Sequence, residues 1–419
     1  MFSMMPTMSS ELKQESVYDL ERRERRLWTL QREGLSRREA LARLGWMALG
    51  GAAVASGISL PRIARGQAAA PAVVKPTPEN IFRTLNTNRE TLFEAFAGQG
   101  YLTPASHFFV RNHTSTPSID AATWSLRIEG SGVANPISFS YEDLLCFRSV
   151  TRTRAIECAG NGRSFFDTQQ GTPASGTAWR LGAIGVAEWR GVRLSDLLDR
   201  AGVRSDALDV MPEGLDPEVG KDGHVRRPLS IEKALDDVLV VYEMNGEPLP
   251  VDHGYPARVL VPGWIGIANV KWVGRIEVST EPLFSAWNTT QYRFTGANYP
   301  DSPVLATQVP KSAFELPFPA TLPAGQNVLT GRSWSPFGSI RRVEVSVDGG
   351  ATYRPAELLG RNLRQAWVQW RFPWQAAAGE HVLRARATDS EGNVQPDTSL
   401  FNDSGYLFGA VVNHPVTVT

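Results

Sequence analysis

The pattern of strand-forming residues changes near Val304, and that change limits the folds open to this chain. Beyond it, apolar and polar residues alternate with a period of two in separate segments joined by turn residues. Asp348-Gly349-Gly350 is typical of a tight turn between antiparallel strands. Short strands at this spacing predict a β-sandwich over residues 304–419. The alternating segments are 325–331, 340–350, 367–372 and 380–389.

Residues 71–303 have a different pattern, in which helical and strand-like segments alternate. Residues 192–202 place apolar side chains at helical spacing and end in Gly202, which is typical of a helix terminus. Residues 124–130 and 258–262 have the apolar patterns of strands. We therefore predict an α+β fold, with a mixed α/β domain followed by the sandwich.

The composition excludes one broad class of partner. The chain has 419 residues, with 43 Lys and Arg against 43 Asp and Glu, so its net charge is zero. A nucleic-acid-binding surface needs a concentration of positive charge, and no basic domain stands out. Hydrophobic residues make up 42% of the chain and charged residues 21%, which is typical of a globular protein. Nucleic acid is therefore not an expected partner.

The N-terminal residues 1–70 have the pattern of an export leader. Arg37 and Arg38 precede a weakly apolar, Gly- and Ala-rich stretch over residues 44–58, which predicts a twin-arginine signal. The stretch is short and broken by glycines, which disfavours a transmembrane helix. This route exports folded proteins, so we expect a periplasmic enzyme that receives its cofactor before export. An amphipathic helix in a charged tail and a retained membrane anchor are the alternatives.

Cys158 lies in a short loop of small residues, with Arg163 five positions later. A thiolate is a soft donor for transition metals, and a neighbouring arginine favours the thiolate and attracts anions. The loop therefore indicates a metal ligand. The chain has two cysteines, and an exported protein can oxidise them, so a Cys146–Cys158 disulfide is the alternative. Spacing alone does not decide between the two.

Several motifs resolve that ambiguity by resemblance. The run Cys158-Ala159-Gly160-Asn161 followed by Arg163 resembles a loop of the sulfite oxidase family of molybdenum enzymes. Further segments resemble that family in the same order along the chain, covering roughly residues 90–300. An ordered set of motifs is far more specific than one short pattern. These segments are 109–113 (FVRNH), 213–216 (EGLD), 242–250, 252–258 (DHGYPAR), 261–264 and 270–272.

The resemblance implies a cofactor and roles for named residues. Cys158 would bind molybdenum carried on molybdopterin, and Arg111 and Arg163 would bind a small oxyanion through their planar guanidinium groups. Tyr292 matches the family's active-site tyrosine, whose hydroxyl would hydrogen-bond the reacting oxygen. The sandwich would be an immunoglobulin-like domain that forms a homodimer, although its charged strands also suit a monomer. The positions expected to contact the cofactor are Phe109, Arg111, His113, Cys158, Asp216, His253, Arg258, Asn269 and Lys271.

Three departures from the family's pattern bear on the substrate. Ser175 stands before Gly176 where vertebrate-type members have lysine. Phe408 falls where the family has a substrate-binding arginine, and Gly162 replaces an arginine that many relatives carry. The pocket would then hold fewer positive charges, and a substrate other than sulfite is open.

These features together predict an exported sulfite-oxidising molybdenum enzyme. With two cysteines so placed, the chain has no Cys-x-x-Cys-His haem attachment motif, so we expect no haem and an external acceptor, such as a c-type cytochrome. A related oxidoreductase acting on sulfane sulfur or another oxyanion is one alternative. A cofactor-free secreted binding protein with a Cys146–Cys158 bridge is another. Tungsten in place of molybdenum is also open.

Overall fold

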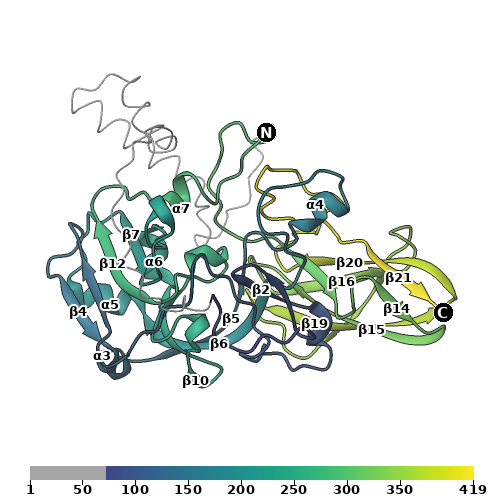
Figure 1. Ribbon diagram of the computed structural model, residues 1–419, viewed down its shortest axis with the longest axis horizontal. Coiled ribbons are helices and arrows are strands. Elements are labelled where there is room, and N and C mark those ends of the chain that lie inside the picture. Colours follow the sequence, from purple (N-terminus) through teal and green to yellow (C-terminus); the bar gives the residue numbers. More distant parts are fainter. Residues whose placement is uncertain (1–71) are drawn as a thin grey trace, which may run out of the picture.

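The structure, a computed structural model, describes residues 72–419. The predicted export signal over residues 1–70 lies outside this range. The described chain forms two β-rich domains that lie at opposite ends of its long axis (Figure 1). No helix among residues 72–419 has both the length and the apolar character needed to cross a bilayer.

The first domain is built on two sheets and a separate hairpin of β1 and β2. One sheet has the order β10-β9-β6-β5, with β11 also paired to β9, and the other has the order β4-β3-β12-β7-β8. The strands are β1 (Phe82–Leu85), β2 (Asn88–Thr91), β3 (Ser125–Glu129), β4 (Ile137–Ser140), β5 (Val150–Glu157), β6 (Ile184–Arg193), β7 (Asp209–Gly214), β8 (Leu229–Ser230), β9 (Leu239–Met244), β10 (Glu247–Pro248), β11 (Arg258–Leu260) and β12 (Val273–Ser279).

Short helices connect these strands and cover their faces. The apolar side of α5 packs into the main core through Leu194, Leu197 and Leu198. Gly202 ends that helix with a left-handed φ of 67°. The predicted helix begins two residues later than expected, because Val192 and Arg193 are paired with β9 as the end of β6. The helices are α3 (Tyr141–Cys146), α4 (Ser164–Thr168), α5 (Leu194–Ala201), α6 (Ile231–Asp236) and α7 (Ala286–Thr289), with 3-10 turns η2 (Phe93–Phe96), η3 (Gly220–Asp222), η4 (Val251–His253) and η5 (Gly266–Ala268).

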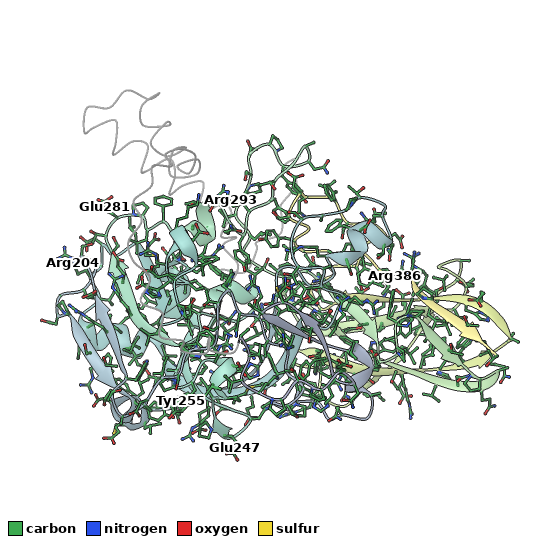
Figure 2. The ribbon with its side chains drawn as sticks, in the orientation of Figure 1. Arg204, Glu247, Tyr255, Glu281, Arg293 and Arg386 are labelled. Atoms are coloured by element: carbon green, nitrogen blue, oxygen red, sulfur yellow. The ribbon has the colours of Figure 1, made fainter. Side chains whose placement is uncertain are left out.

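The second domain is a sandwich of two sheets, with the strand orders β13-β15-β19-β18 and β14-β21-β20-β16-β17. Side chains alternate along β20, where Leu383, Ala385 and Ala387 are buried while Arg386 pairs at 3.3 Å with Glu344 on β16. Figure 2 marks the position of Arg386 in the second domain. The predicted α+β fold with a C-terminal sandwich is confirmed. Its strands are β13 (Lys311–Phe314), β14 (Ala320–Leu322), β15 (Gly325–Trp334), β16 (Ile340–Ser346), β17 (Arg354–Pro355), β18 (Glu357–Leu359), β19 (Trp367–Ala376), β20 (Gly379–Asp389) and β21 (His414–Val418).

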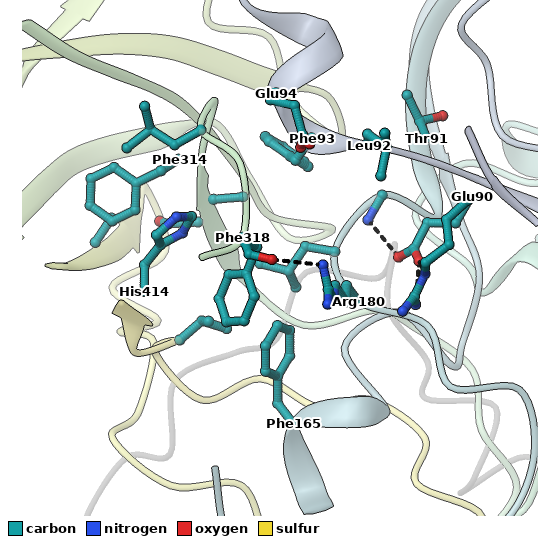
Figure 3. Close-up of a pocket in the computed structure, with 18 residues that line it drawn as sticks. Glu90, Thr91, Leu92, Phe93, Glu94, Phe165, Arg180, Phe314, Phe318 and His414 are labelled. Carbon is teal, nitrogen blue, oxygen red and sulfur yellow. Dashed lines mark hydrogen bonds and ion pairs between the residues drawn. The ribbon is translucent and has the colours of Figure 1, made fainter. Parts of the chain in front are cut away.

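The two domains share a packed seam. One apolar cluster combines rings of the first domain, such as Phe96, with Trp334 and Trp367 of the second. Beside it lies a pocket lined by both domains, where Arg180 donates a 3.0 Å hydrogen bond to the carbonyl of Phe318 (Figure 3). The domains are therefore held by a continuous core.

The segment between β20 and β21 leaves the sandwich and returns to the first domain. The side chain of Gln169 donates to the carbonyl of Val411 at 2.9 Å, and the amide of Leu407 donates to the carbonyl of Ala159 at 2.8 Å. In Figure 1 this yellow segment passes beside α4 before entering β21. Residues near the C-terminus thus lie against the loop that carries Cys158.

Candidate active site

Cys158 follows directly on the last residue of β5, in a turn that leads into α4. Its amide donates to the carbonyl of Ala183 at 2.9 Å, and its carbonyl accepts from the amide of Asn161 at 3.0 Å. The residue is buried and its thiol is free. Cys146, at the end of α3, is exposed and also free, so the alternative disulfide is not formed.

Cys158 lines an open pocket of about 720 Å³, part of it continuous with solvent, between β5, η4, η5 and the segment after β2. All but one of the residues predicted to contact cofactor or substrate line this pocket. They are Phe109, Arg111, His113, Cys158, Asp216, His253, Arg258, Asn269, Lys271 and Tyr292. The structure therefore brings together side chains spread over more than 180 positions of sequence.

Arg258 is the most deeply buried cation of the pocket. Its guanidinium donates to the carbonyls of His253 at 3.0 Å and Asn269 at 2.9 Å, while its Nε has no partner within the described residues. Burial lowers the pKa of Arg258 to about 9. No ion pair to a carboxylate compensates this charge in residues 72–419. Such a group suits an anionic ligand.

His253 and Lys271 extend the polar wall beside Arg258. The imidazole of His253 is buried, and its Nε2 lacks a hydrogen-bond partner in the described chain. Burial, together with the nearby cations, holds its pKa well below the usual value, so His253 is neutral at pH 7. Lys271 donates to the carbonyl of Asp252 at 2.8 Å and to the side chain of Asn112, and burial lowers its pKa.

Unpaired buried nitrogens are rare in folded proteins. The unpaired Nε2 of His253 and Nε of Arg258 therefore indicate that the pocket binds a ligand with polar groups. A thiol, two cations and an unpaired imidazole nitrogen facing one pocket fit a ligand that has a metal, hydrogen-bonding groups and an anionic tail. Asp216, whose pKa is raised by burial, adds an acceptor or donor on the same wall.

Tyr292 closes the pocket on the side of Arg111 and His113. Its hydroxyl lies 3.3 Å from Nε2 of His113, and burial raises the pKa of the phenol. The backbone at Tyr292 has a φ of 54°, a left-handed conformation uncommon for a bulky residue. The imidazole of His113 packs on Trp287, with ring centroids 4.4 Å apart. The ring of Tyr292 itself lies 6.4 Å from the ring of His113 and 6.5 Å from that of Trp287, measured between centroids, so packing holds it in place.

Arg163 is the predicted site residue that does not line the pocket. Its guanidinium is buried behind the Cys158 loop, where it donates to the carbonyls of Ser404 at 2.7 Å and Thr177 at 2.8 Å. A Cβ at Gly160 or Gly176 would meet this guanidinium at 2.8 Å or 3.0 Å. Glycines at these positions therefore make room for the arginine.

The departures at Gly162 and Phe408 meet in space. Phe408 is fully buried against the rings of Phe165 and Phe166, with centroids 5.7 Å and 5.0 Å away. A Cβ on Gly162, which has a φ of 95°, would lie 3.0 Å from the Cβ of Phe408. The two positions that lack the family's arginines thus form one apolar contact. Ser175 instead fixes the returning segment, since its amide and hydroxyl both bond to the carbonyl of Asp403.

Tyr406 belongs to the site, although we did not predict it. Its ring stacks on Tyr292 with centroids 5.3 Å apart, and the guanidinium of Arg163 lies over the Tyr406 ring, 5.1 Å from its centroid. Burial raises the pKa of Tyr406. The signal that could have found it is Phe408, two residues later, which falls where the family has a substrate-binding arginine. The returning segment brings Tyr406 beside Tyr292 and the loop of Cys158, which stands 248 positions earlier in the sequence.

Comparison with known proteins gives consistent results. The family model of the oxidoreductase molybdopterin binding domain matches residues 113–287, and that of the Mo-co oxidoreductase dimerisation domain matches residues 312–417. Mitochondrial sulfite oxidase of Mus musculus is 37% identical over 335 residues, which cover 74% of this chain and 61% of that protein. Sulfite oxidase of Gallus gallus is 35% identical over 330 residues, covering 73% and 71%.

A solved structure matches most of the chain. The sulfane dehydrogenase SoxCD from Paracoccus pantotrophus superimposes with a TM-score of 0.70 and 29% identity, covering 85% of this chain and 96% of that one. The chain spans about three fifths of the length of the mouse enzyme.

Proposed function

Since this chain belongs to the sulfite oxidase family of molybdopterin oxidoreductases, we propose that it is a molybdenum-cofactor enzyme that oxidises sulfite to sulfate. In this reaction sulfite gains one oxygen from water and releases two electrons and two protons. The observation that carries the proposal is the free, buried Cys158 at a pocket that also holds Arg258, a cation with no carboxylate partner in residues 72–419, and the unpaired Nε2 of His253.

The chain's own residues divide the work of binding. Cys158 holds the metal through its sulfur, and Arg258, Lys271 and His253 bind the anionic and polar parts of the pterin. When bound, the molybdenum centre supplies the oxygen-atom transfer and the two-electron redox chemistry. Phe109 and the other pocket residues orient the pterin and exclude water. Asp216, Asn269 and His113 supply the remaining hydrogen-bonding groups.

Arg111 and Tyr292 are the residues that we assign to the substrate. Arg111 lines the pocket with a guanidinium suited to an oxyanion, and the hydroxyl of Tyr292 donates a hydrogen bond to an oxygen of the substrate. Arg163 contributes its positive field from behind the loop, rather than from the pocket wall, since two carbonyls hold its guanidinium. The substrate therefore meets one arginine directly.

A sulfane sulfur compound is a second candidate substrate. The family resemblance expects arginines at Gly162 and Phe408, and these two residues instead form an apolar contact, which favours a substrate of lower negative charge than sulfite, such as a protein-bound persulfide. The similarity to a sulfane dehydrogenase supports the same candidate. Turnover of sulfite compared with that of thiosulfate and a protein-bound persulfide separates the two.

The remaining proposals concern the setting of the reaction. We propose export through the twin-arginine pathway, electron transfer to an external c-type cytochrome, and a homodimer formed by the second domain. The Arg37-Arg38 pair and the match to a dimerisation domain support the first and the last of these. Each electron would leave singly, because a c-type cytochrome accepts one electron at a time.

The two cysteines offer a matched test. Metal analysis and sulfite-dependent reduction of cytochrome c are measured for the unmodified protein, for Cys158→Ser and for Cys146→Ser. We expect molybdenum and turnover in the unmodified protein and in Cys146→Ser, and loss of turnover by at least about 1,000-fold in Cys158→Ser. Full turnover in Cys158→Ser would show that Cys158 is not the metal ligand. Tungsten found in place of molybdenum would show that the proposed metal is wrong.

A further inference from the structure

A buried ion pair joins the second domain to the loop that carries Cys158. Lys311 is the first residue of β13, and its ammonium lies 2.6 Å from Oε1 of Glu157 and 3.1 Å from the carbonyl of Asn161. The side chains of Lys311 and Glu157 are 1% and 2% exposed. Glu157 is the residue directly before Cys158, so this contact reaches the proposed metal ligand across the domain seam.

Every oxygen of Glu157 is engaged. Its Oε1 also accepts from the side chain of Asn161 at 2.8 Å, and its Oε2 accepts from the indole of Trp334 at 2.9 Å. Its backbone carbonyl accepts from Gln308 at 2.7 Å. Three residues that follow the first domain in sequence, Gln308, Lys311 and Trp334, therefore hold one side chain and its carbonyl.

Asn161 carries the same network to the other side of Cys158. Its side-chain oxygen accepts from the amide of Ala183 at 3.0 Å, and its own amide closes the turn on the carbonyl of Cys158. Lys311 thus contacts the residue before Cys158 and the residue three positions after it. The turn is fixed from both ends by a single ammonium group.

A second buried pair in the seam shows what the first one adds. Arg332 lies 2.7 Å from Glu315 and donates to the carbonyls of Phe96, Gln99 and Gly100. This pair also ties the two domains together, but none of its partners belongs to the Cys158 loop or lines its pocket. Holding the domains together therefore does not require charges beside Cys158. An apolar pair of the same volume would serve that purpose as well or better.

We propose that Glu157 and Lys311 are positioning residues through which the second domain fixes the orientation of Cys158 toward the pocket. The inference rests on the proposed function, in which Cys158 holds the metal. Hydrogen bonds that orient a metal ligand generally affect metal affinity and activity without touching the metal. The second domain then has a role within the site in addition to any role in assembly.

The test compares two charge-neutral double variants of the full chain. Glu157→Gln with Lys311→Met removes the pair at the loop, and Glu315→Gln with Arg332→Met removes the control pair. Neither leaves an uncompensated buried charge. Hydrogen exchange is followed for peptides 155–163 and 94–101 in cofactor-free protein, and the metal–thiolate absorption band, kcat and KM for sulfite are measured in loaded protein.

We expect the loop variant to exchange about tenfold faster in peptide 155–163, to shift the absorption band and to lower kcat at least about tenfold, with little change in KM. The control variant should exchange faster only in peptide 94–101 and keep the band and kcat. Glu157→Asp, which keeps the charge but shortens its reach, provides a second variant that retains the ion pair's charges if the double variant does not fold.

Two results would overturn the proposal: an unchanged band and kcat in the loop variant and in Glu157→Asp, or equal losses in the loop and control variants. A different result would contradict the proposed function and not this proposal. If the unmodified protein binds no metal and oxidises no sulfite, the role of Cys158 falls, while the exchange of peptide 155–163 still reports whether the ion pair orders the loop.

Discussion

The pocket and the seam each bury an arginine, but only the arginine in the seam has a carboxylate partner among the described residues. Arg332 in the seam is fully buried, paired with Glu315 at 2.7 Å and bonded to three carbonyls. Arg258 in the pocket is 4% exposed, has no carboxylate partner in residues 72–419 and leaves its Nε unbonded. A buried charge without a partner is costly. The charge of the seam arginine is thus satisfied within the protein, whereas the pocket leaves the charge of Arg258 available to an anionic ligand.

The largest expected effect comes from breaking a seam pair on one side only. Lys311→Met leaves the carboxylate of Glu157 buried without its cation, and we expect the free energy of unfolding to fall by about 3–5 kcal/mol. Adding Glu157→Gln should restore most of that loss. Denaturant unfolding of both variants measures the difference, and equal stabilities would show that the charges are not coupled.

The contrast between the two arginines gives the next prediction. Arg258→Met removes a contact to the ligand, so the difference in unfolding free energy between loaded and cofactor-free protein should shrink by about 2 kcal/mol. Arg332→Met, the matched control, should lower both forms together and leave the difference unchanged. Thermal unfolding of each protein with and without cofactor provides the measurement. A difference that shrinks equally in both variants would contradict the comparison.

Lowering the pH should reduce the free energy of unfolding of the cofactor-free protein, through the buried imidazole of His253. The folded-state pKa of His253 lies well below 6.5, so the unfolded chain binds more protons at pH values under 6.5 and stability falls as the pH is lowered. The expected loss is about 1 kcal/mol per pH unit between pH 6.5 and 5. His253→Gln should flatten the curve in unfolding experiments across this range. An unchanged slope would assign the acid sensitivity to other groups.

The smallest effect on stability is expected for the hydroxyl of Tyr292. Tyr292→Phe keeps the stacked ring and removes only the hydroxyl, which lies 3.3 Å from Nε2 of His113. The free energy of unfolding should therefore change by less than about 1 kcal/mol. Steady-state kinetics should show kcat/KM for sulfite lower by about tenfold, the effect of one lost hydrogen bond. Tyr406→Phe, on the neighbouring ring, is the control, and a larger loss there would exchange the roles of the two tyrosines.

Sequence patterns predicted the strands and helices of the two domains better than the contacts between the domains. The alternation over 380–389 and the apolar spacing over 192–202 are local properties, and β20 and α5 follow them closely. The pairing of Lys311 with Glu157 joins residues 154 positions apart. Neither residue stands in a pattern that distinguishes it from a surface charge, so local reasoning could not find the contact.

The pocket residues were predictable for another reason. Resemblance supplied Arg111, His253 and Lys271 as positions in ordered motifs, and the structure gathers them around one cavity. The same reasoning placed Arg163 at the pocket wall, where the structure has it behind the loop, because motifs carry residue identity and not the direction of a side chain. Tyr406 was not predicted, although Phe408, two residues later, falls where the family has a substrate-binding arginine.

The segment that returns from the sandwich to Cys158 sets an order of events during synthesis. Chains emerge N-terminus first, and domains can fold as they appear. The amide of Leu407 that bonds to Ala159, and the ring of Tyr406, come from the last fifteen residues of the 419. The first domain can assemble its sheets on the ribosome, but the stacking of Tyr406 on Tyr292 and the hydrogen bond to Ala159 form only after this returning segment has been synthesised.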